Sequence, residues 1–195
     1  LPMGCNNLAR SHHFGWGVDV DLERAASLYR RACNRRLGEA CNGLGELAWT
    51  EASCISFEQA AELFRRACDL YSPAGCSNLG VLHEEGKGVA EDFARAAELH
   101  ERACDGGCAL GCGRLGLHYL TGMGRKDDTS RASQLLEQGC RQGDLVVCHW
   151  LAQQLLAGVK LPRDVPRARE LLERACDGGY GESCAELAAL KEAEQ

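Results

Sequence analysis

The cysteines of this 195-residue chain recur at a nearly constant interval, and this periodicity constrains the fold more than any other feature. A first series has spacings of 35, 36, 36 and 36 residues and comprises Cys33, Cys68, Cys104, Cys140 and Cys176. A second series follows the first by 8 positions each time and comprises Cys41, Cys76, Cys112, Cys148 and Cys184. Self-similarity at this period is typical of stacked supersecondary units, so the pattern predicts a repeat protein.

Each cysteine of the second series is followed by a pattern that predicts an amphipathic helix, named here the A helix. An apolar residue and then a small residue follow the cysteine after three and four positions, as in Leu79 and Gly80. We expect the small residue to admit a neighbouring helix, because glycine inside a helix otherwise costs about 1 kcal/mol. A further glycine is expected to end the helix, at Gly15, Gly86, Gly122 and Gly158.

The second half of each repeat predicts another helix, named the B helix. Its expected N-caps have short side chains that accept hydrogen bonds from free backbone amides, and they are Asp21, Ser56, Asp92, Asp128 and Asp164. Ser56 and Gln59 have the spacing of a capping box, and Pro166 falls in the first turn of its helix. No segment has the period-two alternation that is typical of a strand.

The predicted fold class is therefore all-α, a right-handed α-solenoid of antiparallel helix pairs that form a single domain. Short helices of this kind are marginal alone and gain their stability from stacking. The expected units are residues 4–38, 39–73, 74–109, 110–145 and 146–181, followed by a terminal helix at 182–195.

Two places depart from this regular pattern. The unit from Cys41 to Cys76 is one residue short and has Thr-Glu-Ala-Ser-Cys-Ile at 50–55 in place of a Gly-x-Gly loop, so its turn is expected to differ. The chain also opens in an A helix with no B helix before it. We expect an N-terminal continuation or a partner chain to cover this first helix.

The two cysteines of each pair are expected on facing sides of a helical hairpin. Packed helices lie about 8–10 Å apart, which brings facing Cβ atoms within reach of a disulfide. The predicted bridges are Cys33–Cys41, Cys68–Cys76, Cys104–Cys112, Cys140–Cys148 and Cys176–Cys184. The chain-entropy argument gives each short loop about 2.5 kcal/mol of stabilisation.

Three cysteines, Cys5, Cys54 and Cys108, have no partner in this register. Cys54 and Cys108 are interpreted as free, paired with another chain, or minor functional thiols. The in-register partner of Cys5 would lie before Leu1, which favours an N-terminal continuation. The close spacing of Cys104, Cys108 and Cys112 leaves a metal or redox cluster as an alternative, although zinc sites usually contain Cys-x-x-Cys, which this chain lacks. A disulfide framework indicates an oxidising compartment: periplasmic or extracellular, or the intermembrane space of mitochondria.

Several of these motifs resemble the Sel1-like repeat. They are Asn-Leu-Gly at 78–80, Gly-Lys-Gly-Val at 86–89, Asp92 with the Arg-Ala that follows at 95–96, and Arg-Ala-Cys at 102–104. The cysteine pairs further resemble the Helicobacter cysteine-rich proteins and a related mitochondrial oxidase assembly factor. The resemblance implies a protein-interaction scaffold. The resemblance also implies two alternative functions. The first is penicillin binding or weak β-lactamase activity, and the second is haem or metal binding in oxidase assembly.

Composition and motifs exclude several function classes. A net charge of −6 argues against a nucleic-acid-binding protein, and no apolar run reaches the roughly 18 residues of a membrane span. A serine β-lactamase needs Ser-x-x-Lys, which is absent at Lys87, Lys126, Lys160 and Lys191. The histidines do not converge and are interpreted as surface or groove residues, with adventitious metal binding by His12 and His13 as the alternative. No cofactor or catalytic residue is predicted.

A binding groove is the favoured functional interpretation. In a helical solenoid the A helices line the concave surface, and the first, second and fifth positions after each cysteine are expected to point into it. Asparagine side chains there can donate to and accept from an extended peptide or protein partner, Arg114 can meet a carboxylate, and Trp150 offers an aromatic anchor. The predicted groove residues are Asn7, Arg10, Asn42, Glu46, Asn78, Arg114, His149, Trp150 and Gln153.

Overall fold

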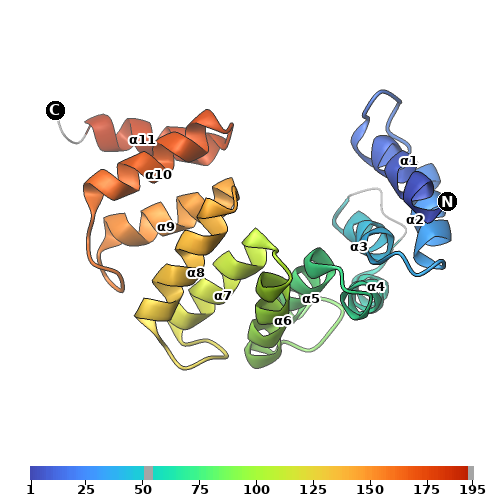
Figure 1. Ribbon diagram of the computed structural model, residues 1–195, viewed down its shortest axis with the longest axis horizontal. Coiled ribbons are helices and arrows are strands. Elements are labelled where there is room, and N and C mark those ends of the chain that lie inside the picture. Colours follow the sequence, from blue (N-terminus) through green and yellow to red (C-terminus); the bar gives the residue numbers. More distant parts are fainter. Residues whose placement is uncertain (51–54, 193–195) are drawn as a thin grey trace. The chain divides into compact units, whose positions relative to one another are not determined.

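The computed structural model describes residues 1–50 and 55–192, which divide into two compact units, Leu1–Gly107 and Cys108–Gln195. Every regular element in the described residues is helical (Figure 1). The first unit contains α1 (Pro2–Phe14), α2 (Leu22–Cys33), α3 (Gly38–Glu46), the 3-10 turn η1 (Leu47–Trp49), α4 (Phe57–Asp69), α5 (Pro73–Glu85) and α6 (Phe93–Asp105). The second contains α7 (Ala109–Thr121), α8 (Thr129–Arg141), α9 (Leu145–Ala157), α10 (Val165–Asp177) and α11 (Gly181–Glu192).

Within each unit, helices that follow one another in the sequence pack together. The odd-numbered helices are the predicted A helices and the even-numbered ones are the B helices. Within a unit, each A helix contacts the B helix that follows it, as α1 does α2, and each B helix contacts the A helix that follows it in the same unit, as α2 does α3. This arrangement confirms the all-α class of stacked helical hairpins.

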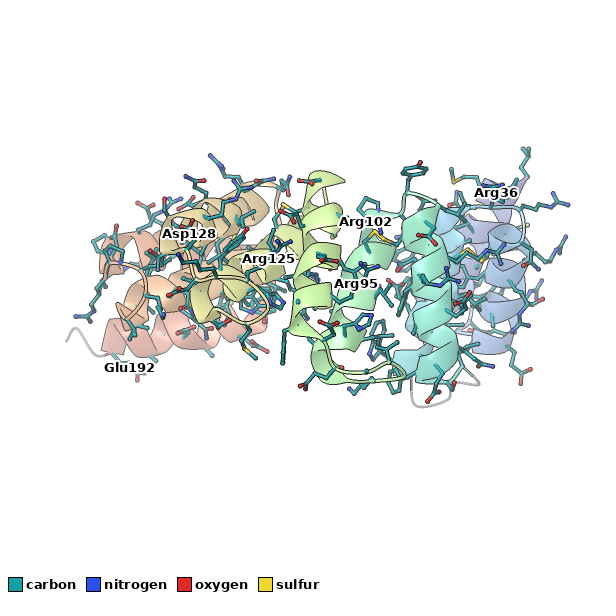
Figure 2. The ribbon with its side chains drawn as sticks, turned by 90° about the horizontal axis from the view of Figure 1, so that it is seen from below. Arg36, Arg95, Arg102, Arg125, Asp128 and Glu192 are labelled. Atoms are coloured by element: carbon teal, nitrogen blue, oxygen red, sulfur yellow. A yellow bond between two sulfur atoms is a disulfide. The ribbon has the colours of Figure 1, made fainter. Side chains whose placement is uncertain are left out.

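The B helices begin, and four A helices end, at the capping residues that the sequence predicts. Asp92 caps α6 by accepting a hydrogen bond from the backbone N–H of Arg95 at 2.9 Å, and Asp128, labelled in Figure 2, caps α8 in the same way. Ser56 and Gln59 form the predicted capping box at the start of α4. Gly86 ends α5 with a φ of 63°, in the left-handed region that other residues rarely adopt.

The core of each unit consists of alanine and larger apolar side chains from both helix types. The first unit buries Tyr29, Phe64, Leu82 and Leu99 completely, and the second unit buries Leu136, Leu151, Leu171 and Leu172. Two of these buried side chains, Tyr29 and Phe64, pack directly against the backbone of α3 at glycine positions. A Cβ on Gly43 would lie 2.6 Å from Tyr29 Cε1, and one on Gly45 would lie 2.6 Å from Phe64 Cε1. The small residues therefore serve the close packing that the sequence predicts.

Arginines two positions before the first cysteine connect adjacent repeats. Arg66 Nη2 donates to the carbonyl of Cys33 at 2.8 Å. Arg102, labelled on α6 in Figure 2, has its Nη2 at 3.5 Å from the carbonyl of Cys68. These contacts pair a guanidinium with the C-terminal end of the preceding B helix, where the helix dipole favours a cation.

Disulfides join cysteine pairs at the predicted spacing. Cys33–Cys41, Cys68–Cys76, Cys140–Cys148 and Cys176–Cys184 have Cα atoms 4.5–4.7 Å apart. Cys104 and Cys112 are disulfide-bonded as well, whereas Cys5 and Cys108 are free thiols. Cys54 lies outside the described residues. These bridges indicate an oxidising location outside the cytosol.

The bounds of the A helices differ from the predicted ones. Each A helix after the first begins three residues before the second cysteine, as α5 does at Pro73, whereas the sequence pattern places its start at the cysteine. Because η1 follows α3, the A helix of the short repeat ends early, and most of the turn expected at 50–55 lies outside the described residues.

The first A helix is less covered than its counterparts. Leu8 on α1 is 42% exposed, whereas Leu44 at the same repeat position is 3% exposed. Covering of this face by another segment or chain stays a prediction. No helix in the described ranges combines the length and apolar character that crossing a membrane requires.

Candidate binding surface

The predicted groove residues of the first unit surround a pocket of about 440 Å³. Asn7 and Arg10 of α1 line it together with Asn42 and Glu46 of α3. Its remaining lining residues are Met3, Asn6, Phe14, Tyr29, Glu39, Gly43, Ser72 and Ala74. Four of the five predicted groove residues of this unit therefore meet in one cavity.

Asn78, the fifth, joins the pocket residues through hydrogen bonds across two A helices. Its Nδ2 donates to Asn42 Oδ1 at 2.9 Å and lies 3.4 Å from Glu46 Oε1. Asn42 Nδ2 in turn donates to Glu46 Oε1 at 2.8 Å. We name Asn42, Glu46 and Asn78 the amide–carboxylate chain. It fixes the orientation of the Glu46 carboxylate, because both amide donors converge on one of its oxygens.

Asn6, the first position after Cys5 and therefore one of the positions expected to face the groove, is a further functional candidate in this pocket. It is 5% exposed and lines the pocket, and its buried Oδ1 has no hydrogen-bond partner among the described residues. A buried acceptor without a donor costs about 1–3 kcal/mol. The repeat position of Asn6 is that of Asn42, one repeat later.

Aromatic side chains form one side of this pocket. The Tyr29 hydroxyl lies 3.4 Å from His13 Nδ1, and the His13 ring stacks on Phe14 with centroids 4.2 Å apart. Burial and, secondarily, the nearby Glu46 charge raise the pKa of Tyr29 to about 12. Burial lowers the pKa of His13 from its ordinary value, and Glu46 partly opposes this shift. Both groups are therefore neutral at pH 7.

Arg10 faces an aromatic ring instead of a carboxylate. Its Cζ lies 5.2 Å from the centroid of the Trp16 ring, within cation–π range. Trp16 belongs to the turn after α1 and is exposed. This contact was not predicted from the sequence, because it depends on how the turn folds back toward the helix.

The second unit presents the other predicted groove residues on α7 and α9. Arg114 Cζ lies 5.7 Å from the centroid of the half-buried Trp150 ring, and Gln153 is exposed. His149 is buried: its Nδ1 lies 3.0 Å from Ser183 Oγ, and its ring packs edge-on against Tyr180. The first position after the cysteine is thus largely buried, as Asn6 and Asn42 also show.

The interpretation of the histidines as surface or groove residues is wrong for most of them. His12, His100, His118 and His149 are buried. His12 and His83, at equivalent repeat positions, place Nδ1 3.4 Å and 3.1 Å from loop carbonyl oxygens of Asp19 and Ala90. Histidine at this position therefore anchors the loop between A and B helices.

Two of the three cysteines of the alternative metal site at Cys104, Cys108 and Cys112 cannot act as metal ligands. Cys104 and Cys112 are in disulfide form, and a disulfide sulfur does not supply the thiolate that zinc requires. Cys108 remains a partly exposed thiol at the start of α7.

Comparison with known proteins identifies the repeat. The Sel1 repeat family model matches residues 2–37, 34–72, 73–108, 109–144 and 147–180. A comparison with curated proteins gives no significant match.

Solved structures of this kind resemble the chain over most of its length. A Sel1 repeat protein from Oxalobacter formigenes superposes with a TM-score of 0.81 at 26% identity, covering 97% of this chain and 78% of that one. Helicobacter pylori cysteine rich protein B has a TM-score of 0.55 at 30% identity, covering 66% and 93%. The protective antigen c5321 of uropathogenic Escherichia coli, with an SLR fold, has a TM-score of 0.75 at 23% identity, covering 99% and 42%.

Proposed function

This chain belongs to the Sel1 repeat family, and on that basis we propose that it is a non-catalytic interaction scaffold that binds an extended peptide segment of a partner protein along its A helices. Sel1 repeats are typical of such scaffolds, and the fold by itself does not define a partner. The proposal therefore depends on the site. We further propose that the protein works in the periplasm or as a secreted protein, since its disulfides need an oxidising environment.

The observation that carries this proposal is the amide–carboxylate chain beside the pocket of the first unit. A peptide in extended conformation presents alternating N–H and C=O groups, which require matching polar partners along their path. Asn42, Glu46 and Asn78 place such partners on two successive A helices. Asn7 and Arg10 add donors from α1 on the other side of the pocket.

The second unit supports the same function with a different kind of contact. Trp150 offers a large aromatic surface, and Arg114 and Gln153 offer polar groups at the positions equivalent to those of the first unit. Aromatic and arginine side chains contribute most to many protein interfaces. We propose that Trp150 is an anchor for an apolar side chain of the same partner class.

Selection from a random dodecapeptide display library on the oxidised protein tests the proposal. We expect enriched peptides to bind the wild type and to lose at least tenfold in affinity for an Asn42→Ala/Asn78→Ala variant. Asn7→Ala is a milder second variant, because the exposed Asn7 side chain lies outside the amide–carboxylate chain. Asn34→Ala, an exposed asparagine at the end of α2, is the matched control. Equal affinity for wild type and the double variant, with circular dichroism unchanged, would contradict peptide binding at this face.

A further inference from the structure

Two oxygens of residues that line the first-unit pocket accept no hydrogen bond from the described residues: Glu46 Oε2 and Asn6 Oδ1. In the amide–carboxylate chain, both Nδ2 groups are used internally, and both approach Oε1 of Glu46. Among the described residues, no donor contacts Glu46 Oε2. Asn6 Oδ1 is likewise buried and without a donor. These two oxygens therefore lack a hydrogen-bond donor, and a ligand that supplies one to each would satisfy them.

The net charge of the pocket lining is negative, which also favours a ligand with positively charged hydrogen-bond donors. Its lining contains two carboxylates, Glu39 and Glu46, and one guanidinium, that of Arg10. Arg10 stacks over Trp16 and forms no ion pair with either carboxylate. A carboxylate that is held in place by neutral amides keeps its full charge for an incoming cation, because neither amide neutralises it.

Apolar surface completes the match to a long basic side chain. Met3, Phe14 and the ring of Tyr29 line the pocket beside the carboxylates. Lysine and arginine bury their aliphatic stems against such surfaces while the charged head reaches a polar partner, and aromatic faces attract the cation itself. The cavity of about 440 Å³ accommodates one side chain of this size.

We propose that this pocket binds the cationic side chain of a lysine or arginine in the partner peptide, with Glu46 Oε2 as its principal acceptor and Asn6 Oδ1 as a second. The inference rests on the proposed function, since it names the residue class that the peptide-binding face selects. Glu39 contributes charge, and the amide–carboxylate chain holds Glu46 in position. Basic segments of partner proteins are then the preferred targets of this unit.

Titration with single amino-acid derivatives tests the pocket without a full peptide. Nα-acetyl-lysine amide and Nα-acetyl-arginine amide are compared with Nα-acetyl-norleucine amide, which has a similar stem and no charge. We expect the two cations to shift the backbone amide NMR signals of Asn6, Asn42 and Glu46, with at least fivefold weaker binding of norleucine amide. Equal shifts from norleucine amide, or no shift from the cations, would overturn the inference.

Matched variants assign the effect to Glu46. Glu46→Gln keeps the shape of the side chain and an oxygen for Asn42, and we expect it to weaken the binding of both cations at least fivefold. Glu39→Gln is expected to weaken it about twofold. Glu98→Gln on α6 removes an exposed carboxylate that pairs with Arg95 outside the pocket and should leave binding unchanged. Cation binding that is unaffected in Glu46→Gln would overturn the assignment.

The selected dodecapeptides separate this inference from the proposed function. We expect these peptides to share a lysine or arginine. Replacing that residue by norleucine should lower the affinity for the wild type at least tenfold, and should change the affinity for Glu46→Gln little. Peptides that bind at this face and tolerate norleucine would overturn the inference and leave the scaffold function standing. Failure to select any peptide would count against the scaffold function, while the amino-acid titration would still decide whether the pocket takes a cation.

Discussion

The ring of Phe64 on α4 lies directly against the backbone of Gly45 on α3, where a Cβ would come within 2.6 Å of Cε1. Tyr29 makes the equivalent contact with Gly43 on the other side of the same helix. The absence of a side chain at these two glycines of α3 thus lets a large side chain from each adjacent B helix pack against its backbone. The helix propensity lost at these positions is offset by close packing.

Gly45→Ala is expected to destabilise the protein, although alanine is the better helix former. The added methyl overlaps a buried aromatic ring, and overpacking of this kind costs about 1–3 kcal/mol. Gly4→Ala on α1 is the matched control, because a Cβ there meets nothing within 4 Å and should stabilise the helix by a few tenths to about 1 kcal/mol. Chemical unfolding followed by circular dichroism measures both, and equal stability of the two variants would argue against the contact with Phe64.

Loss of one disulfide is expected to cost about 2.5 kcal/mol of unfolding free energy in the repeat that contains it. Cys33→Ala/Cys41→Ala removes a buried bridge with a sequence separation of 8 residues. The control is Cys5→Ser, which alters a partly exposed free thiol and should change stability by less than about 0.5 kcal/mol. Denaturant titration without reductant makes the comparison. A double variant as stable as Cys5→Ser would mean that packing alone holds this hairpin.

The His13 pKa is expected below 6.5 in the folded protein, mainly because burial disfavours the cation. A lowered pKa means that the unfolded chain takes up the proton more readily. The contribution of His13 to stability is therefore complete above pH 6.5 and decreases as the pH falls through the lowered value. NMR titration of the His13 ring measures the pKa. A value above 6.5 would contradict the burial of this ring.

Glu46→Gln is expected to lower the pKa of both His13 and Tyr29, because the Glu46 charge raises each of them. Tyr29 has the opposite linkage to His13, since its pKa is raised from 10.0 to about 12. Its contribution to stability is complete below pH 10.0 and is lost as the pH rises toward about 12. Ultraviolet titration at alkaline pH follows Tyr29. Unchanged values for both residues in Glu46→Gln would place the carboxylate farther from them than the structure does.

Ser56→Ala should cost about 1 kcal/mol, because it removes the acceptor for the N–H of Gln59 and opens the capping box of α4. Ser130→Ala, within the exposed first turn of α8 and not a cap, is the matched control and should change stability by less than about 0.5 kcal/mol. Thermal unfolding compares the two. Equal effects would show that the capping hydrogen bond contributes nothing measurable.

The sequence predicts the local features of this fold well, because their chemistry is local. Asp92 caps a helix and Gly86 ends one for reasons contained within a few neighbouring residues. The burial of Asn42 and His149 was not predictable in this way, since it depends on how each A helix is rotated against its neighbours. The unpartnered oxygen of Asn6 and the contact of Arg10 with Trp16 need three-dimensional positions of residues from different turns.

The short span of each bridge also bears on how the chain is oxidised. A thiol eight positions from its partner meets it by closing a loop of a size that forms in about 10–100 ns, and closure becomes costlier as the intervening chain lengthens. Native pairing within each hairpin is therefore kinetically favoured over pairing between distant repeats. Cys108 interrupts this order, since it stands midway between Cys104 and Cys112 and competes for both. Scrambled oxidation products should concentrate in that one segment.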